Sequence, residues 1–216
     1  MQFSKNWLKE FIDINLSTQE ICHQLTMAGL EVDGYEDVKS KITGNDSIIK
    51  LDITPNRGDC FSVLGVAREL AVINNLKFSL PKINKISESF TDDINLKVCK
   101  DGPIYFGRTI KNISLKSKTL PLIAERLKLS DQKLIDPVVD ITNYILLELG
   151  QPLHAFDRQK LNGDVTVRLA KEKEKIILLD DQDNTKEKEE KINEGDPLWL
   201  KDKKDIKEED YKQFYN

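Results

Sequence analysis

The stretch from Ile135 to Asp157 constrains the fold of this chain more than any other, because both ends of one helix are marked in it. It reads IDPVVDITNYILLELGQPLHAFD. Asp136 has the side chain of a helix N-cap, and Pro137 suits the first turn, where a backbone N–H needs no partner. Gly150 favours the left-handed conformation that follows a helix, and the proline soon after it prevents continuation. Between these ends we predict a buried helix whose apolar stripe is Val138, Ile141, Ile145 and Leu149.

The turn after this helix carries the strongest candidate for a functional side chain. It presents His154, one of 2 histidines in the chain, close to Asp157. Functional residues concentrate on loops held by rigid elements, and an imidazole titrates near neutral pH. We therefore take His154 as a candidate catalytic or ligand-binding residue. The alternative is a histidine that caps or packs at a helix end, and Asp157 is interpreted as a turn acid rather than a general base.

The charge balance argues against a generally basic, nucleic-acid-binding surface. The 216 residues include 33 Lys and Arg against 37 Asp and Glu, for a net charge of -4. We expect no DNA partner, and any RNA contact to be local. No apolar run is long enough to span a membrane and the opening MQFSKNWLKE lacks a secretory core, so we expect no membrane partner and a cytoplasmic location. A solvated face, rather than a phosphate site, is the interpretation of Lys111, Lys116, Lys118, Arg126 and Lys128.

The cysteines predict neither a disulfide framework nor a metal site. Cys22, Cys60 and Cys99 are far apart and form no C-x-x-C pair, which is typical of reduced thiols buried as small hydrophobes. The chain also contains no P-loop and no G-x-G-x-x-G motif. We therefore expect no structural metal and no cofactor in this chain.

The N-terminal region predicts a small α/β unit over residues 1–80. Ser4 can cap a short helix, and the capping box Ser17-Thr18-Gln19-Glu20 opens a second helix that ends at Gly29. Alternating apolar and polar residues predict two strands, Leu30–Asp33 and Ser47–Ile53. The polar segment Lys39–Ser47 is interpreted as a linker or a tight turn.

A third helix follows a sharp loop at Thr54–Asp59, which is rich in turn-favouring residues. Asp59 is predicted to be its N-cap. The buried stripe of this helix would be Val63, Val66, Ala67, Leu70 and Ile73. The segment Asn75–Asp93 has little periodicity, so a boundary between structural units is placed inside it.

A second unit is predicted over residues 94–180. It contains an expected helix at Leu120–Leu129 and expected strands at Ile94–Val98, Tyr105–Ile113, Val165–Leu169 and Ile176–Leu179. In the tail, residues 181–216, charges of both signs crowd together up to Lys191 without apolar residues, and such a segment is expected to be solvated or disordered. The predicted fold class is therefore α+β, a mixed α/β chain with a charged tail.

Several segments resemble one protein family in the family's own order. TPNRGDCFSVLGVAREL at 54–70 and DITNYILLELGQPLHAFD at 140–157 look like the β chain of bacterial phenylalanyl-tRNA synthetase. The resemblance extends to MQFSKNWLKEFI, LTMAGLEVDG, YFGRTIKNI and LNGDVTVRLAKEKEKIILLD. It covers most of Met1 to Asp180. It implies a split N-terminal α/β unit followed by the first part of an editing domain of the B3/B4 type.

The chain departs from this family in two places. An oligonucleotide-binding barrel that contacts tRNA interrupts the family sequence where this chain has only residues 39–47. The family's editing domain also continues well past Asp180 and is followed by further domains. The resemblance therefore implies a truncated beta subunit.

The resemblance implies a function and two site residues. The family charges tRNA(Phe) with phenylalanine using ATP and magnesium, as a complex with a synthetase alpha subunit, and hydrolyses mischarged Tyr-tRNA(Phe). Such editing is needed because a pocket for an apolar side chain excludes a similar one only weakly. The editing-pocket residues carried over are His154 and Lys133, which stands where the family commonly has arginine. A point charge would replace a planar fork there, and with the rest of the pocket missing we expect no intact catalytic site and an inactive chain.

The tail resembles a different family. KEKEEKINEGDPLWLKDKKDIKEEDYKQFYN, at 186–216, is similar to the linker and first middle-domain helix of the heat-shock chaperone with a GHKL ATPase domain. This leaves two alternatives to a truncated synthetase subunit. One is a non-catalytic protein- or RNA-binding scaffold module, and the other is a chimeric gene product.

Overall fold

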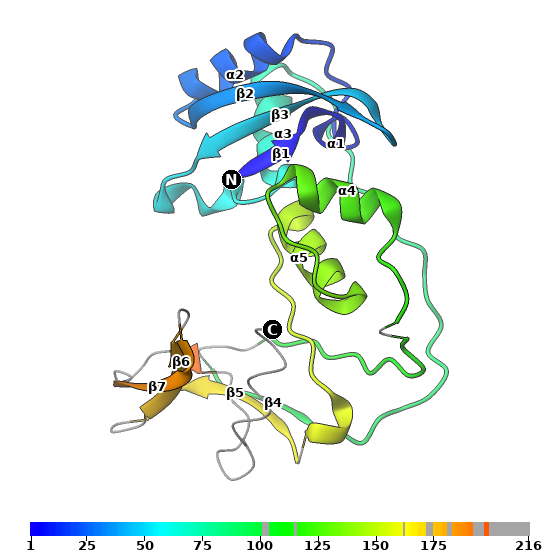
Figure 1. The fold of residues 1–216 in the computed structure, drawn as a ribbon, viewed down its shortest axis with the longest axis vertical. Coiled ribbons are helices and arrows are strands. Elements are labelled where there is room, and N and C mark those ends of the chain that lie inside the picture. The colour runs from blue at the N-terminus through cyan, green and yellow to red at the C-terminus, as the bar shows by residue number, and fades with distance from the viewer. Residues whose placement is uncertain are drawn as a thin grey trace. The chain divides into compact units, whose positions relative to one another are not determined.

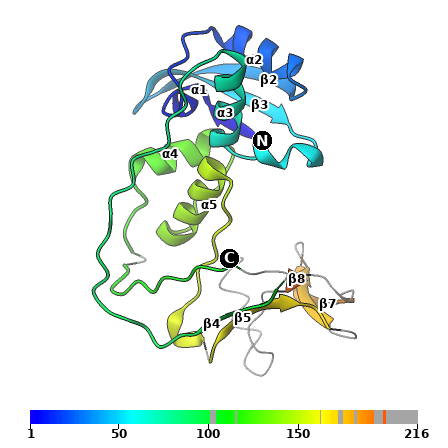
Figure 2. The ribbon, with the colours of Figure 1, turned by 180° about the vertical axis from the view of Figure 1, so that it is seen from behind.

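The computed structural model describes residues 1–100, 104–114, 116–161 and 163–171, together with the backbone of three later strands, 175–180, 183–191 and 197–198. The chain divides into two compact units (Figures 1 and 2). The N-terminal unit combines Met1–Lys85 with Ser114–Ala155, and the second unit combines Ile86–Ile113 with Phe156–Asn216. This division differs from the expected segments 1–80 and 94–180, because the two helices after Ser114 pack with the N-terminal unit.

A three-stranded antiparallel sheet forms the centre of the N-terminal unit, in the order β1 (Gln2–Ser4), β3 (Gly44–Asp52), β2 (Glu31–Ser40). β2 and β3 make a hairpin through the tight turn at residues 41–43, where Ser40 Oγ accepts from the backbone N–H groups of Ile42 at 3.0 Å and Thr43 at 2.7 Å. Both strands are longer than expected. The segment 39–47 is therefore the end of a hairpin and not a separate linker.

Three helices, α1 (Lys5–Leu8), α2 (Thr18–Met27) and α3 (Val63–Ile73), pack against this sheet and against one another (Figure 1). The predicted caps of the first two are confirmed. Ser4 accepts from the N–H of Trp7, and Ser17 and Glu20 form both hydrogen bonds of the capping box. The enclosed core includes Phe3, Trp7, Leu8, Phe11, Ile21, Leu25, Ile49, Leu51, Val66 and Leu70.

The predicted cap of α3 is wrong. Ser62 is the N-cap, and its Oγ accepts from the N–H of Gly65 at 3.0 Å. Asp59 lies earlier, in the 3-10 turn η1 (Pro55–Cys60). Residues Pro55–Cys60 form the 3-10 turn, so Asp59 cannot cap the helix. The α-helix begins only at Val63, and Ser62 precedes it directly.

The remaining helices of this unit are α4 (Pro121–Leu129) and α5 (Pro137–Leu149). The marked ends of α5 are confirmed: Asp136 accepts from the N–H groups of the first turn, and Gly150 has a φ of 72°. The expected burial of its apolar stripe is wrong. The buried residues of α5 are Asp140 and Glu148, whereas Ile141 is 46% exposed.

The second unit contains the remaining described strands. β4 (Leu96–Val98) runs parallel to β5 (Val165–Leu169), which pairs antiparallel with β8 (Pro197–Leu198). β6 (Lys175–Asp180) and β7 (Asp183–Lys191) form an antiparallel pair. The unit also contains the short 3-10 turn η2 (Arg158–Lys160), followed by β5.

Two sequence expectations change in this unit. Tyr105–Ile113 was expected to be a strand, but the backbone there pairs with no described strand and Phe106 is 92% exposed. The alternating apolar and polar residues of this segment therefore do not form a buried face of a sheet among the described residues. Conversely, Asp183–Lys191, expected within a solvated tail, has its backbone paired in β7, and residues 199–216 lie outside the described residues. None of the described helices is long and apolar enough to cross a membrane.

Candidate functional site

The two residues expected from the sequence to belong to a pocket lie at opposite ends of α5. Lys133 precedes the helix by a short loop, and His154 follows its C-terminal glycine. A helix of this length extends about 20 Å. Both side chains are exposed. The structure therefore assigns both residues to the N-terminal unit but does not bring them together.

His154 has the electrostatics of a neutral imidazole. Protein atoms displace part of the water around its ring, and this desolvation lowers the pKa of His154 below its ordinary value. At neutral pH the ring can therefore both donate and accept a hydrogen bond. Shallow hollows of the unit lie elsewhere, one against α2 around His23 and one against α3 around Asn75.

A buried polar network, here called the clasp, joins α5 to the start of the chain. It consists of Trp7, Glu10, Arg126, Tyr144 and Glu148. Arg126 on α4 is only 4% exposed, donates to the Tyr144 hydroxyl at 2.7 Å and forms an ion pair with Glu10. Glu148 Oε1 accepts from the Tyr144 hydroxyl at 2.7 Å and from the indole N–H of Trp7 at 3.2 Å.

Aromatic contacts reinforce the clasp. The rings of Trp7 and Tyr144 stack with centroids 4.9 Å apart and planes 17° apart, and the Arg126 guanidinium lies 5.1 Å from the Trp7 centroid. Burial alone would lower the pKa of Arg126, but the hydrogen bond to Glu10 and the neighbouring Tyr144 outweigh it and raise this pKa. Burial, with the acceptor Glu148, raises the pKa of Tyr144. Arg126 is therefore charged and the Tyr144 hydroxyl is protonated at neutral pH.

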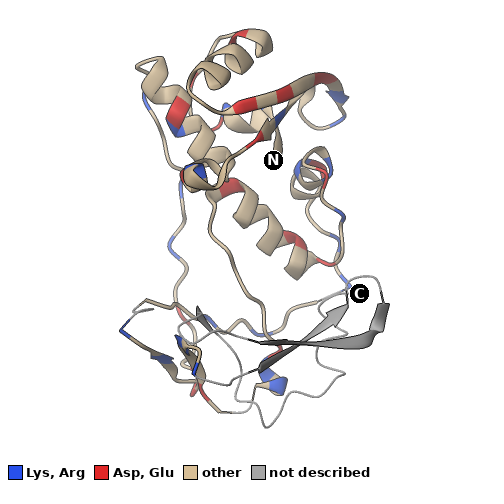
Figure 3. Cartoon of the chain, turned by 90° about the vertical axis from the view of Figure 1, so that its left-hand side faces the viewer, with Lys and Arg blue, Asp and Glu red and all other residues tan. Residues whose placement is uncertain are grey.

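Sequence reasoning missed the clasp. It interpreted Arg126 as part of a solvated face, and it followed the apolar stripe of α5 as the buried one. A signal was present: Asp140, Tyr144 and Glu148 recur every four residues, which places them on one helical face. In Figure 3 this helix carries red acidic positions and no blue basic ones, in agreement with its sequence. Asp140 is buried as well, and it accepts from the N–H of Ile135 at 2.9 Å and from the Thr119 hydroxyl.

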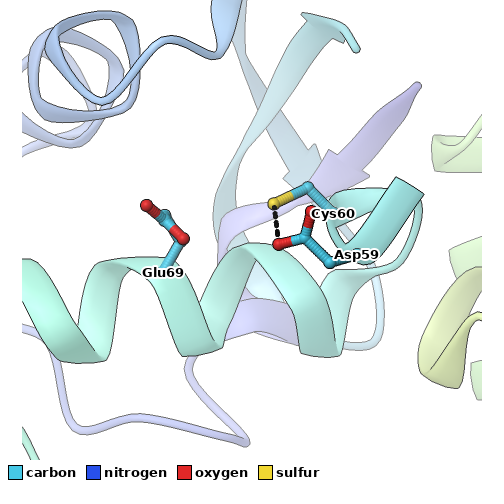
Figure 4. Close-up of side chains that lie close together, drawn as sticks. All are labelled: Asp59, Cys60 and Glu69. Atoms are coloured by element: carbon cyan, nitrogen blue, oxygen red, sulfur yellow. Dashed lines mark hydrogen bonds between the residues drawn. The ribbon is translucent and has the colours of Figure 1, made fainter. Parts of the chain in front are cut away.

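A second cluster lies where α3 meets the turn η1 (Figure 4). The ligand-type atoms of Asp59, Cys60 and Glu69 lie within 4.8 Å of one another. Arg57 supplies the positive charge among them: its Nε is 3.2 Å from Asp59, and its Nη2 is 2.9 Å from Glu69 and 3.1 Å from Cys60 Sγ. Asp59 therefore pairs with Arg57 and does not cap the helix.

The thiol in this cluster is chemically quiet. Burial and the hydrogen bond to Asp59 raise the pKa of Cys60 to about 11, so the thiol stays protonated at neutral pH. A protonated thiol is a poor nucleophile and a poor metal ligand. The hydrogen bond with Arg57 holds the pKa of the Asp59 carboxyl at about 2. The cluster is therefore an ion-paired support for the turn.

Comparison with known proteins adds a family to this geometry. The family described as the B3/4 domain matches residues 101–207. That match continues past Asp180, the expected end of the editing-type domain, into the segment that was expected to resemble a chaperone. Both Lys133 and His154 lie inside it.

Curated relatives match a larger part of the chain. The phenylalanine–tRNA ligase beta subunit of Photorhabdus laumondii is 47% identical over 67% of this chain and 18% of its own length. The corresponding subunit of Idiomarina loihiensis is 46% identical over 68% of this chain and 19% of its own length. The chain thus spans less than a fifth of these relatives.

One solved structure is also similar. It is an N-terminal fragment of the phenylalanyl-tRNA synthetase beta subunit from Pyrococcus horikoshii, aligned over 81% of this chain and 46% of that one. The sequence identity is 20% and the TM-score is 0.35.

Proposed function

We propose, from the relation of this chain to the phenylalanine–tRNA ligase beta subunits, that it serves as an N-terminal part of such a subunit. The identity of 47% to the Photorhabdus subunit carries this proposal. The B3/4 match at residues 101–207 supports it. The intact ligase would join phenylalanine to tRNA(Phe) with ATP and magnesium in the cytoplasm, with an alpha subunit and tRNA(Phe) as partners.

The proposal includes a limit on activity. Hydrolysis of mischarged Tyr-tRNA(Phe) requires groups that hold the ester and a water together within hydrogen-bonding reach. Lys133 and His154 are exposed and lie at the two ends of α5. We therefore propose that they contribute to an editing pocket in the complete subunit and that this chain alone does not deacylate.

A deacylation assay tests the limit. Tyr-tRNA(Phe) incubated with this chain should release tyrosine at the rate seen in buffer. Release above buffer would contradict the proposal if His154→Ala abolishes it. His23→Ala is the matched control, because His23 is the other histidine and lies on α2.

A second candidate function is a non-catalytic binding module. It is favoured by the exposed apolar side chains of α5, Ile141 at 46% and Leu146 at 42% exposure. Capture of a purified synthetase alpha subunit by the tagged chain, without deacylation, would favour this role. Loss of capture in Ile141→Asp, with capture retained in Asn143→Asp, would locate the contact at Ile141. Failure to bind either the alpha subunit or tRNA(Phe) would remove both candidates.

A further inference from the structure

We propose that the clasp makes α4 and α5 one folding unit with the start of the chain, so that the N-terminal unit, and not the strands β4 and β5, fixes the positions of Lys133 and His154. The inference rests on the proposed function only in naming those two residues as pocket residues. It deepens that function by naming the contacts that hold these two residues.

The first argument is that the clasp connects residues far apart in sequence. Glu10 and Arg126 are separated by 116 positions, and Trp7 and Glu148 by 141. Helix α4 supplies the guanidinium, and helix α5 supplies the phenol and one carboxylate. Trp7 and Glu10, near the start of the chain, supply the indole and the second carboxylate. Neither helix can leave without breaking this network.

The second argument is energetic. Arg126 and Glu148 are buried charged groups whose hydrogen bonds are all supplied by the clasp. Removing one partner from a buried ion pair strands the other in a poorly solvated place, which costs far more than losing an exposed pair. In the assembled unit these groups satisfy one another, so the loss of one member leaves buried polar atoms without partners. The network therefore specifies how α5 meets Trp7.

Independent contacts hold the same helices at other points. The Gln2 amide donates to the carbonyl of Leu129 at 2.9 Å, and the Ser40 hydroxyl donates to Glu125 at 2.6 Å. At the end of α5, a Cβ placed on Gly150 would lie 3.3 Å from Ser62, the cap of α3. These contacts hold α4 at two further points and the C-terminal end of α5 at one.

Native-state hydrogen exchange on the full chain tests the inference. At increasing urea concentrations, the slowest amides of α5 should exchange through the same opening as those of α3, because residues of one cooperative unit open together. Arg126→Met should reduce protection in both helices by about 10-fold to 100-fold. Protection in β4 and β5 should be unchanged. Arg68→Met is the control, since Arg68 is an exposed arginine of α3.

Two outcomes of the exchange experiment would overturn the inference. One is an α5 that opens at lower urea than α3, and the other is an α5 that opens together with β5. Because Arg126→Met can fail to fold, a double-mutant cycle of Trp7→Phe and Glu148→Gln provides a second measurement. Coupling between these variants is expected in the unfolding midpoint, and strict additivity would also overturn the inference. Neither readout involves tRNA, so a failed deacylation or binding assay leaves both results interpretable.

Discussion

At the scale of single residues, substitution by alanine is predicted to have very different effects at Gly58 and at Gly65. A Cβ on Gly65 would lie 2.0 Å from the backbone oxygen of Asp59, whereas a Cβ on Gly58 would meet nothing within 4 Å. Gly65→Ala therefore forces α3 away from η1 and should lower the free energy of unfolding by about 3 kcal/mol or more. Gly58→Ala should change it by less than about 1 kcal/mol. Urea unfolding followed by circular dichroism measures both.

One result would contradict the prediction for these two glycines. Equal destabilisation by the two alanines would mean that α3 and η1 do not pack as closely as the structure shows. The sequence places Gly58 in the predicted turn and Gly65 in the predicted helix, but it does not show how closely Gly65 approaches Asp59. The difference arises from the approach of two backbone segments, which is a tertiary property.

At the scale of elements, the structure predicts that Ser62 and not Asp59 supports the start of α3. Ser62 is buried and accepts from the N–H of Gly65, whereas Asp59 is exposed and pairs with Arg57. Ser62→Ala should cost about 1 kcal/mol of unfolding free energy, as typical for loss of a cap. Asp59→Asn should cost less, because exposed ion pairs contribute little. If Asp59→Asn lowered the unfolding free energy more than Ser62→Ala in thermal or urea unfolding, Asp59 would be the residue that supports the start of α3.

The caps show how much of the fold could be predicted from sequence. Ser17 with Glu20, and Asp136 with Gly150, mark helix ends through contacts within a few residues, so their patterns were sufficient. The prediction of Asp59 as a cap was wrong because a second residue suited to capping, Ser62, follows three positions later. Only the 3-10 turn, which contains Asp59, distinguishes the two.

The buried face of α5 was missed for a different reason. Apolar periodicity assumes that the core is apolar, but Tyr144 and Glu148 are buried by Trp7 and Arg126 from distant parts of the chain. The same limit applies to the candidate site. The sequence singled out His154, the family resemblance added Lys133, and the predicted helix already separated the two; only the fold showed that both are exposed. Their role in a pocket stays a prediction.

At the scale of the whole molecule, the division into two units predicts two separable unfolding transitions. The chain has 2 tryptophans, so Trp199→Phe leaves Trp7 as the sole fluorophore. Trp7 is 1% exposed in the core of the N-terminal unit and stacks on Tyr144, so its emission should report the unfolding of that unit. In this background Leu70→Ala, which empties a fully buried site of the same core, should lower the unfolding free energy by about 2 to 5 kcal/mol.

The matched variant lies in the other unit. Val167→Ala removes methyl groups from β5, whose described pairing partners, β4 and β8, also belong to the second unit. Sites that share no partners contribute independently to stability, so the Trp7 transition should keep its midpoint and slope. A joint shift would mean that the units unfold as one body. In that case the position of α5 would depend on β5 as well as on the clasp, and assigning Lys133 and His154 to the N-terminal unit alone would lose its physical basis.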